Sequence, residues 1–268
     1  MGIPLLLVDA FTDRPFSGNP AAVCLLPAWR DERWLQNLAA EMKHSETAYL
    51  VRNADGFDLR WFTPATEVAL CGHATLASAH ALWEEGIAPA SRPIRFATKK
   101  SGTLTAAPNN GRIELDFPLN PDEKIDPPAD LLPALGVTAQ YVGKSRFDYL
   151  VEVESEDVLR RMKPDFRRLA AEPVRGTIVT CRSAIPPFDF VSRFFAPASG
   201  VDEDPVTGSA HCCLGPYWQK RLGKSEFVAY QASPRGGVVH VRVANDRAIL
   251  GGQAVTVTKG ELTASAFG

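Results

Sequence analysis

Two stretches of the sequence match each other and divide the chain: residues 60–68 read RWFTPATEV and residues 193–201 read RFFAPASGV. Arginine, phenylalanine, proline, alanine and valine recur between them at a constant offset of 133, almost half of the 268 residues. A threonine recurs at an offset of 132, as Thr75 and Thr207, and a Ser-Ala-His tripeptide follows each stretch. Five matches at one offset, with the same chemistry, predict an internal duplication.

Each copy predicts a strand, a turn and a buried helix. Proline cannot donate to a strand ladder, so Pro64 and Pro197 are expected to end the two strands. Residues 74–83, which follow the first strand, are apolar on nearly all sides, as in a helix enclosed by a sheet. Residues 209–222 form a similar run, in which the Gly215-Pro216 pair predicts a kink or a break.

Most of the remaining chain predicts short strands separated by turns, because β-branched and aromatic residues alternate with polar ones between glycines and prolines. The predicted strands cover residues 3–8, 19–26, 47–51, 57–63, 94–97, 103–106, 112–117, 149–153, 177–181, 188–195, 227–231, 238–243 and 248–257. Surface helices are predicted at residues 31–42, 129–135 and 157–170, the last interrupted by Pro164.

The duplication and the strand pattern predict an α+β fold of two pseudo-symmetric lobes, each a curved mixed β-sheet wrapped around a central helix. Residues 118–128, rich in proline and charge, are the predicted lobe boundary. The N-terminal lobe is predicted to comprise residues 1–117 with 261–268, and the C-terminal lobe residues 118–260.

Composition argues against several classes of function. The chain has 29 basic and 31 acidic residues, a formal net charge of −2, without the basic cluster that nucleic-acid or membrane-surface binding needs. No apolar run approaches the length of a bilayer-spanning helix, so no membrane span is predicted. The five cysteines are odd in number and lack framework spacing, which predicts reduced thiols and a cytoplasmic location.

Cofactor motifs are also missing from the sequence. The histidines and cysteines lack zinc-site spacing, and neither Gly-Lys-Ser tripeptide has the earlier glycine of a phosphate loop. No G-x-G-x-x-G follows the first strand, and no G-x-S-x-G elbow occurs. The protein is therefore predicted to act without a metal, nucleotide or pyridoxal cofactor.

Several motifs, taken in order, resemble the PhzF-like family of phenazine-biosynthesis proteins, which has the diaminopimelate epimerase fold. They are VDAFT at 8–12, FSGNP at 16–20, SET at 45–47, FTP at 62–64, CGHAT at 71–75, EDPVTGSA at 203–210 and GGQAV at 251–255. Together they are specific for the family but not for a substrate. The resemblance implies an active site in the cleft between two lobes, and a cofactor-independent isomerase that works by proton transfer.

The resemblance also implies roles for individual residues. Glu46 matches the acid/base glutamate of the family's best-known reaction, the isomerisation of trans-2,3-dihydro-3-hydroxyanthranilate. His73, Asp204 and Ser209 match residues that line the site and assist proton handling or substrate binding. A small anionic metabolite and a second copy of the chain, forming a homodimer, are the partners that the resemblance implies.

The chemistry of these residues suits those roles. Glu46 opens the apolar residues 47–51, where desolvation raises a carboxyl pKa towards the range of a general base at neutral pH. The two buried helices are predicted to begin near His73 and Ser209, and helix N-termini offer unpaired N–H groups to an anion. The predicted substrate-binding residues are Asn19, Ser45, Gly72, Thr207 and Gly208. The alternative interpretation is that Thr75, Thr207 and Ser209 only cap helices.

Cys71 distinguishes this chain from the epimerases of the same fold, which use two thiols, one at the start of each central helix. Cys71 matches the first position, whereas no cysteine lies near Asp204-Pro205, and Cys212 and Cys213 fall inside the helix. Two-thiol racemisation is therefore not expected. Two other hypotheses remain: a one-base amino-acid epimerase using Glu46 with Cys71 or His73, and a non-catalytic protein that binds a metabolite or partner.

Overall fold

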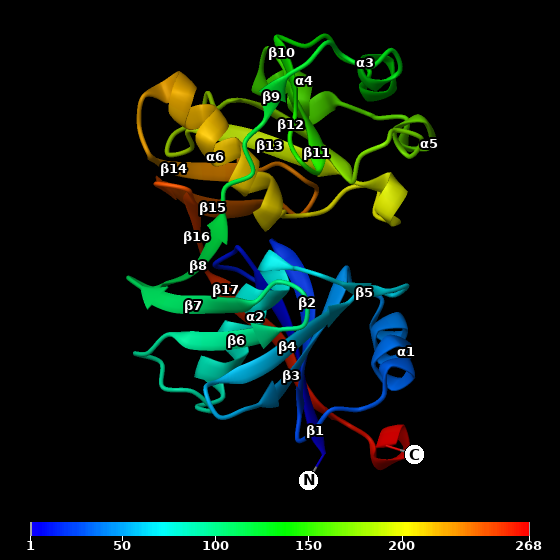
Figure 1. Cartoon of the computed structure of the whole chain (residues 1–268), viewed down its shortest axis with the longest axis vertical. Helices are drawn as coiled ribbons and strands as arrows, with labels where there is room; N and C mark the ends of the chain where they lie inside the picture. Colours follow the sequence, from blue (N-terminus) through cyan, green and yellow to red (C-terminus); the bar gives the residue numbers. More distant parts are fainter. Residues whose placement is uncertain (1, 268) are drawn as a thin grey trace. The chain divides into compact units, whose positions relative to one another are not determined.

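The chain folds into two compact units, which the computed structural model describes over residues 2–267 (Figure 1). Unit 1 comprises Met1–Asp116 with Gly251–Gly268, and unit 2 comprises Phe117–Leu250. The chain leaves unit 1 near the end of one strand, β8 (Arg112–Pro118), and returns within another, β16 (Arg247–Gly252). Each unit is a mixed sheet with few helices, so the predicted α+β class is confirmed.

The sheet of unit 1 has two parallel pairs of strands, β2–β3 and β4–β6, among antiparallel neighbours. In spatial order its strands are β17 (Ala254–Leu262), β1 (Ile3–Ala10), β2 (Asn19–Leu26), β3 (Glu46–Arg52), β4 (Phe57–Phe62), β6 (Ile94–Thr98), β7 (Thr103–Asn109) and β8. The short strand β5 (Glu67–Val68) folds back on β4.

The sheet of unit 2 repeats this order of orientations, with parallel pairs β11–β12 and β13–β14. Its strands are β9 (Glu123–Lys124), β10 (Tyr141–Lys144), β11 (Asp148–Glu152), β12 (Gly176–Arg182), β13 (Phe190–Phe195), β14 (Glu226–Gln231), β15 (Gly237–Ala244) and β16. The repeated alternation of parallel and antiparallel pairs supports the duplication that the sequence predicts.

Each unit contains one long, buried helix. In unit 1 this is α2 (Gly72–Glu84), which packs against β1, β2, β3, β7 and β17 because nearly all its faces are apolar. In unit 2 it is α6 (Gly208–Leu222), which packs against β15. Of the kink or break predicted at Pro216, the break does not occur. Helix α6 runs through the proline, and Cys212 O, left without its helical donor, accepts from Asn120 N at 3.1 Å.

The remaining helices cover the outside of the sheets. Helix α1 (Glu32–Met42) begins where Asp31 accepts a hydrogen bond from Trp34 N, and ends at the left-handed residue Lys43. Its residues Leu35 and Ala39 pack in an apolar cluster against β3. In unit 2 the surface helices are α3 (Leu131–Leu135), α4 (Glu156–Arg161) and α5 (Phe166–Leu169). Pro164 separates α4 from α5, as predicted.

Two sequence-based expectations about the fold need correction, and the one about membrane-spanning helices does not. The return to unit 1 lies at Gly251 rather than at residue 261, because β17 pairs with β1 along its length. The predicted strand at 248–257 is two strands, β16 and β17, separated at Gln253. Within residues 2–267, no helix has both the length and the apolar character needed to cross a bilayer.

The matched Ser-Ala-His tripeptides are also not structurally equivalent. Because α2 begins at Gly72 and α6 at Gly208, His211 lies in the first turn of its helix, whereas His80 lies near the end of α2. Likewise Thr207 is the N-cap of α6, a position that Cys71 occupies in α2. The true correspondence at the helix starts is therefore Cys71 with Thr207.

Candidate active site

Glu46 and His73 meet at the start of the buried helix of unit 1. Glu46 is the first residue of β3, where it pairs with Ala21 of β2, and its side chain is 18% exposed. His73 is the second residue of α2 and is 4% exposed. His73 Nε2 lies 3.2 Å from Glu46 Oε2. The pair thus joins a partly exposed glutamate, whose Oε2 is buried, to a buried imidazole.

Hydrogen bonds among Ser45, Asn19 and His73 form a closed ring that fixes the imidazole. Ser45 Oγ donates to Asn19 Oδ1 at 3.2 Å, so the Asn19 amide nitrogen faces His73 Nδ1, at 3.1 Å. An amide nitrogen can only donate, so Nδ1 accepts and the proton of a neutral imidazole lies on Nε2. Nε2–H then points to Ser45 Oγ, 3.2 Å away, beside Glu46.

Burial keeps His73 neutral. It lowers the pKa of His73 to about 3, well below the ordinary value of 6.5, because a charged imidazolium would lose its hydration. A neutral His73 presents an N–H dipole to the Glu46 carboxylate without neutralising its charge. The N-terminus of α2 adds partial positive charge near the same carboxylate.

Cys71 lies next to this pair. It is the N-cap of α2, and its side chain does not cap the helix. Its Sγ is 3.5 Å from His73 Nδ1 and 3.9 Å from Nε2. Glu46, Cys71 and His73 therefore offer one oxygen, one sulfur and one nitrogen within 4.8 Å of one another.

The start of the buried helix in unit 2 is held by Gln231. Thr207 N donates to Gln231 Oε1 at 2.8 Å, and Gln231 Nε2 donates to Asp204 O at 2.8 Å. The Thr207 hydroxyl donates to Asp204 Oδ2 at 2.5 Å, so it does not cap α6. Ser209, the second residue of α6, and Asp204 are both half-buried, and the helix N-terminus beside them suits an anion.

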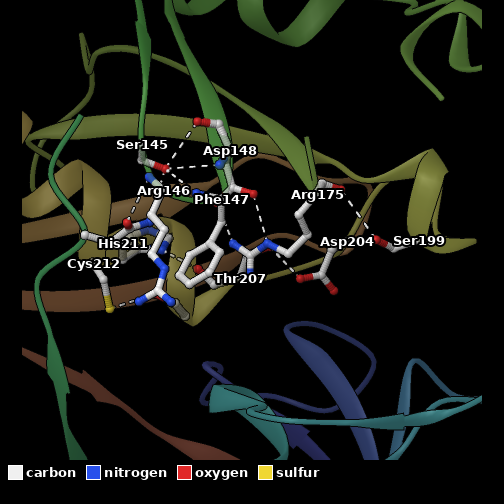
Figure 2. Close-up of polar contacts among 12 residues, drawn as sticks. Ser145, Arg146, Phe147, Asp148, Arg175, Ser199, Asp204, Thr207, His211 and Cys212 are labelled. Carbon is white, nitrogen blue, oxygen red and sulfur yellow. Dashed lines mark hydrogen bonds and ion pairs between the residues drawn. The ribbon is translucent and has the colours of Figure 1, made fainter. Parts of the chain in front are cut away.

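Arg175 lies near the polar residues at the start of α6 in unit 2. Its guanidinium binds both carboxylate oxygens of Asp148, whose side chain is completely buried. Burial raises the pKa of Asp148, and Arg175 opposes that effect. Figure 2 shows the Asp204 side chain pointing toward the same guanidinium. Arg175 thus lies between a buried carboxylate and one near the start of α6.

A pocket of about 410 Å³ opens beside Arg175 within unit 2. Its lining carries three basic side chains and one acidic one, with the exposed ring of Phe147 between two arginines. The lining residues are Lys144, Arg146, Phe147, Glu172, Pro173, Val174 and Arg175. The excess of positive charge favours a carboxylate or another anion.

The repeat shows what unit 2 has in place of Glu46. Phe62 and Phe195 match in the two repeats and pair with Thr47 and Thr177, the second residues of β3 and β12. The residue before Thr177 is Gly176. A Cβ there would lie 2.5 Å from Phe194 Cζ and 2.8 Å from Phe195 O, so this position admits no side chain without movement. Unit 2 therefore lacks the carboxylate of unit 1.

The predicted site residues fall into two groups. The structure brings Asn19, Ser45, Glu46, Gly72 and His73 together in unit 1. It brings Asp204, Thr207, Gly208 and Ser209 together in unit 2. Asn19 is fully buried and bonded to His73, so it supports the imidazole.

Sequence reasoning missed three residues of unit 2: Arg175, Asp148 and Gln231. Arg175 precedes the glycine that matches Glu46, so an alignment of the two repeats by strand register would have drawn attention to it. Asp148 and Gln231 lie in strands without a motif, and only the folded structure brings them to Arg175 and Thr207.

Comparison with known proteins agrees with this fold and these motifs. The chain belongs to the phenazine biosynthesis-like (PhzC-PhzF) protein family, whose model matches residues 8–260. It is 56% identical over 263 residues to an uncharacterized isomerase of Halalkalibacterium halodurans, covering 98% of this chain and 99% of that protein. It is 41% identical to the human phenazine biosynthesis-like domain-containing protein, covering 98% of this chain and 100% of that one.

A solved structure of similar sequence supports the same assignment. The crystal structure of a PhzF-family phenazine biosynthesis protein from Enterococcus faecalis superposes with a TM-score of 0.93 at 40% identity. The match covers 98% of this chain and all of that one. The predicted family is thus confirmed.

Proposed function

We propose that this chain is a cofactor-independent isomerase that moves a proton on a small anionic metabolite, with Glu46 as the general acid/base. Membership of a family with relatives named as isomerases supports an isomerase-type enzyme. The proposal adds the group that moves the proton, the way it is held, and the kind of substrate it acts on.

The contact between Glu46 and His73 is the observation that carries the proposal. A general base must reach its substrate and keep a fixed orientation. Glu46 is partly exposed, and His73 Nε2 lies 3.2 Å from its Oε2. His73 is itself fixed by Asn19 and Ser45, so the carboxylate is oriented by a buried network. The imidazole stays neutral at physiological pH and leaves the proton transfer to Glu46.

The lack of an equivalent carboxylate in unit 2 supports one base rather than two. The residue that matches Glu46 is Gly176, and the N-cap that matches Cys71 is Thr207. A threonine hydroxyl bonded to Asp204 is a poor replacement for a thiol. One carboxylate would therefore remove the proton from one atom of the substrate and return it to another.

Unit 2 has groups of its own that are suited to binding an anion. The start of α6 presents N–H groups beside Ser209, and Arg175 lies next to Asp204. Lys144 and Arg146 add positive charge around the pocket. These groups favour a ligand with a carboxylate, either amino-acid-like or cyclic.

A second candidate function uses Cys71 with Glu46 in a one-base epimerisation of an amino acid. The observation that favours it is the position of the Cys71 sulfur, 3.5 Å from His73 Nδ1. Against it, the Nδ1 lone pair already accepts from Asn19, so His73 has no free base with which to activate the thiol.

The substitution Glu46→Gln tests the proposal. It keeps the shape of the side chain but removes its ability to take a proton, and general acid–base catalysis contributes roughly 10²–10⁴-fold. We expect the loss of kcat to lie at the upper end of that range, while the melting temperature changes little. Glu41→Gln, which changes an exposed glutamate of α1, is the matched control and should keep the wild-type rate.

The assay needs a substrate, which a panel of amino acids and cyclic carboxylates can supply by screening for deuterium uptake from D₂O. A folded Glu46→Gln protein that keeps more than about a tenth of the wild-type kcat would show that another group moves the proton, given the size of such contributions. His73 and Asp204 would then be the next residues to replace.

A further inference from the structure

Each unit contains an arginine that binds a glutamate through both carboxylate oxygens. In unit 1 Arg60 donates to Glu67 at 2.7 and 2.8 Å, and in unit 2 Arg193 donates to Glu203 at 2.7 and 2.8 Å. The exposed fractions of these four side chains lie between 10% and 16%. A two-point contact between a planar guanidinium and a carboxylate has a defined geometry. Each pair therefore holds two segments of its unit in a fixed relative position.

The two arginine–glutamate contacts occupy equivalent places in the repeat. Arg60 is the fourth residue of β4, and Arg193 is the fourth residue of β13. Glu67 precedes the N-cap of α2 by four residues, and Glu203 precedes the N-cap of α6 by four residues. Arginine and glutamate are seven residues apart in unit 1 and ten in unit 2. The contact is thus present in both units although the loop that it closes differs in length.

In unit 1 the contact connects the two elements that carry the candidate site. Arg60 pairs with Tyr49 of β3, the strand that begins with Glu46. Glu67 lies just before α2, whose second residue is His73. We propose that Glu67 is a positioning residue, which through its arginine keeps His73 beside Glu46. This inference rests on the proposed function, because it is Glu46 as the base that makes the position of His73 important for turnover.

The segment between the contact and the helix is short. Three residues, 68–70, separate Glu67 from the N-cap Cys71. The first of them pairs with β4, and Ala69 O accepts a hydrogen bond from the Ser101 hydroxyl at 2.8 Å. Three residues span at most about 10 Å even when fully extended. A shift of Glu67 would therefore be passed on to the start of α2.

A second carboxylate on Arg60 separates the proposed role from simple charge pairing. Arg60 Nη2 donates to Glu32 Oε1 at 2.8 Å, the same distance as to Glu67 Oε2. Glu32 is the first residue of α1, and its side chain is 66% exposed, against 16% for Glu67. Both glutamates offset the charge of Arg60, but of the two it is Glu67 that leads into α2. Glu32 is therefore a matched control.

The kinetic test compares Glu67→Gln with Glu32→Gln in the full chain, with the substrate found by deuterium uptake. Each substitution keeps the size of the side chain and removes one charge bound to Arg60. A misplacement of about 1 Å can cost roughly 10²-fold in rate, so Glu67→Gln should lower kcat by about fivefold to 10²-fold. KM should stay within about twofold, because the lost interaction affects the transition state rather than substrate binding.

The control should keep kcat and KM within about twofold, as expected for an exposed ion pair. Circular dichroism and the melting temperature show whether each variant is folded at the assay temperature. An unchanged kcat in folded Glu67→Gln, or an equal loss in Glu32→Gln, would overturn the positioning role. So would a rise in KM at constant kcat.

Arg60→Lys tests whether Glu67 acts through the arginine. Lysine keeps the positive charge but cannot form the two-point contact. The double variant Arg60→Lys/Glu67→Gln should lose no more kcat than the worse single variant, because both substitutions break the same contact. Losses that multiply would show that Glu67 acts independently of Arg60 and would overturn the mechanism. If Glu67→Gln does not fold, Arg60→Lys is compared with Glu32→Gln under the same criteria.

Hydrogen exchange tests the contact without any substrate. The first hydrogen-bonded amides are those of residues 75–78 in α2 and 211–214 in α6. Glu67→Gln should lose protection at 75–78 and keep it at 211–214, because local opening is confined to the loosened segment. Glu203→Gln should show the reverse.

Wild-type protection at 75–78 in Glu67→Gln would overturn the inference, whatever the kinetics of Glu46→Gln. Turnover that persists in Glu46→Gln would instead overturn the proposed function, and the exchange result would still report on the contact. The two ideas can therefore fail separately.

Discussion

The two units share an order of strands and a buried helix, yet only unit 1 begins the strand beside that helix with a carboxylate. In unit 1 the strand beside the helix begins with Glu46, and the helix places His73 next to it. In unit 2 the corresponding strand begins with Gly176, and the half-buried Ser209 takes the place of His73. The duplication therefore repeats the scaffold without repeating the chemistry.

The difference is structural as well as chemical. Gly176 is packed against Phe194 and the backbone of Phe195, so no larger residue fits there. Arg175, just before it, instead binds the buried Asp148. Unit 1 thus holds the proposed proton-transfer group, and unit 2 holds groups suited to an anion. A duplicated fold with a single base favours one shuttle that moves the proton in both directions.

After Glu46→Gln, the largest effect on this comparison is expected from His73→Leu, which removes the imidazole whose Nε2 lies 3.2 Å from Glu46 Oε2. A polar contact to a charged group contributes at most about 1.5–3 kcal/mol, the range for such hydrogen bonds, so kcat should fall by up to roughly 150-fold. His80→Leu, on the same helix but near Glu84, should stay within about threefold on the same argument. An unchanged rate in folded His73→Leu would show that Glu46 needs no support from the imidazole.

Gly176→Ala tests whether unit 2 excludes a side chain at the position of Glu46. Its Cβ would approach Phe195 O to 2.8 Å, and overpacking of this kind costs about 1–3 kcal/mol of unfolding free energy. Gly260→Ala, in β17 with no atom within 4 Å of the new Cβ, should change stability by less than about 0.5 kcal/mol. Denaturant unfolding measures both. Equal stability of the two variants would contradict the packing argument.

The buried histidines His73 and His211 predict a loss of stability in mild acid. Burial lowers their pKa values to about 3 and about 4, while in the unfolded chain both titrate near 6.5. Between pH 6.5 and 5 the two histidines therefore bind protons in the unfolded state but not in the folded state. Below pH 6.5, each histidine should lower the free energy of unfolding by an amount that approaches about 1.4 kcal/mol per pH unit. Above pH 6.5 its contribution to the free energy of unfolding is fully present.

His211→Gln isolates one of these contributions. His211 Nδ1 contacts Thr207 O at 2.8 Å, which a glutamine amide can replace. Denaturant unfolding at pH 6.5, 5.75 and 5 should show that the variant loses stability with a slope smaller by about one proton. The same slope in the variant and the wild type would mean that His211 titrates alike in both states.

The smallest effect is expected from Cys71→Ser, because the matching position in unit 2 is Thr207 and the second thiol of an epimerase pair is absent. Cys212, in α6, does not replace the missing second thiol. Burial raises the pKa of Cys212 to about 12, so its thiol stays protonated. The value of kcat should fall less than about threefold, since the thiol is not a general acid or base in the proposed reaction. A thousandfold loss would favour the thiol-based alternative.

The sequence predicted the duplicated α+β fold because its strands and buried helices carry strong periodic patterns. It missed β10, where Gly143 weakens the strand signal, although a Cβ there would approach Tyr141 Cε1 to 2.9 Å and Glu123 O to 3.1 Å. It predicted a kink or a break at Pro216, whereas α6 continues without a break and Asn120 satisfies the carbonyl that proline leaves free. Such compensation comes from residues distant in sequence and leaves no local pattern.

The candidate site was predicted only in part, because some of its contacts also join residues that are distant in sequence. Glu46, His73 and Asp204 came from motifs, whereas Arg175 and Gln231 act through contacts that only folding creates. The ring around His73 also changes the role expected of Asn19, from binding substrate to fixing the imidazole. A cytoplasmic location and a homodimer stay predictions, testable by fractionation and by light scattering.

Deuterium uptake from D₂O tests the claim of a single base most directly, because it reports proton removal apart from complete turnover. Uptake into substrate and into product is followed from both directions of the reaction, in wild type and in Glu46→Gln. One shuttle predicts that the variant loses uptake in both directions by at least about 10²-fold, the lower end for general acid–base catalysis. Uptake that survives in either direction at the wild-type rate would show a second base and contradict the account.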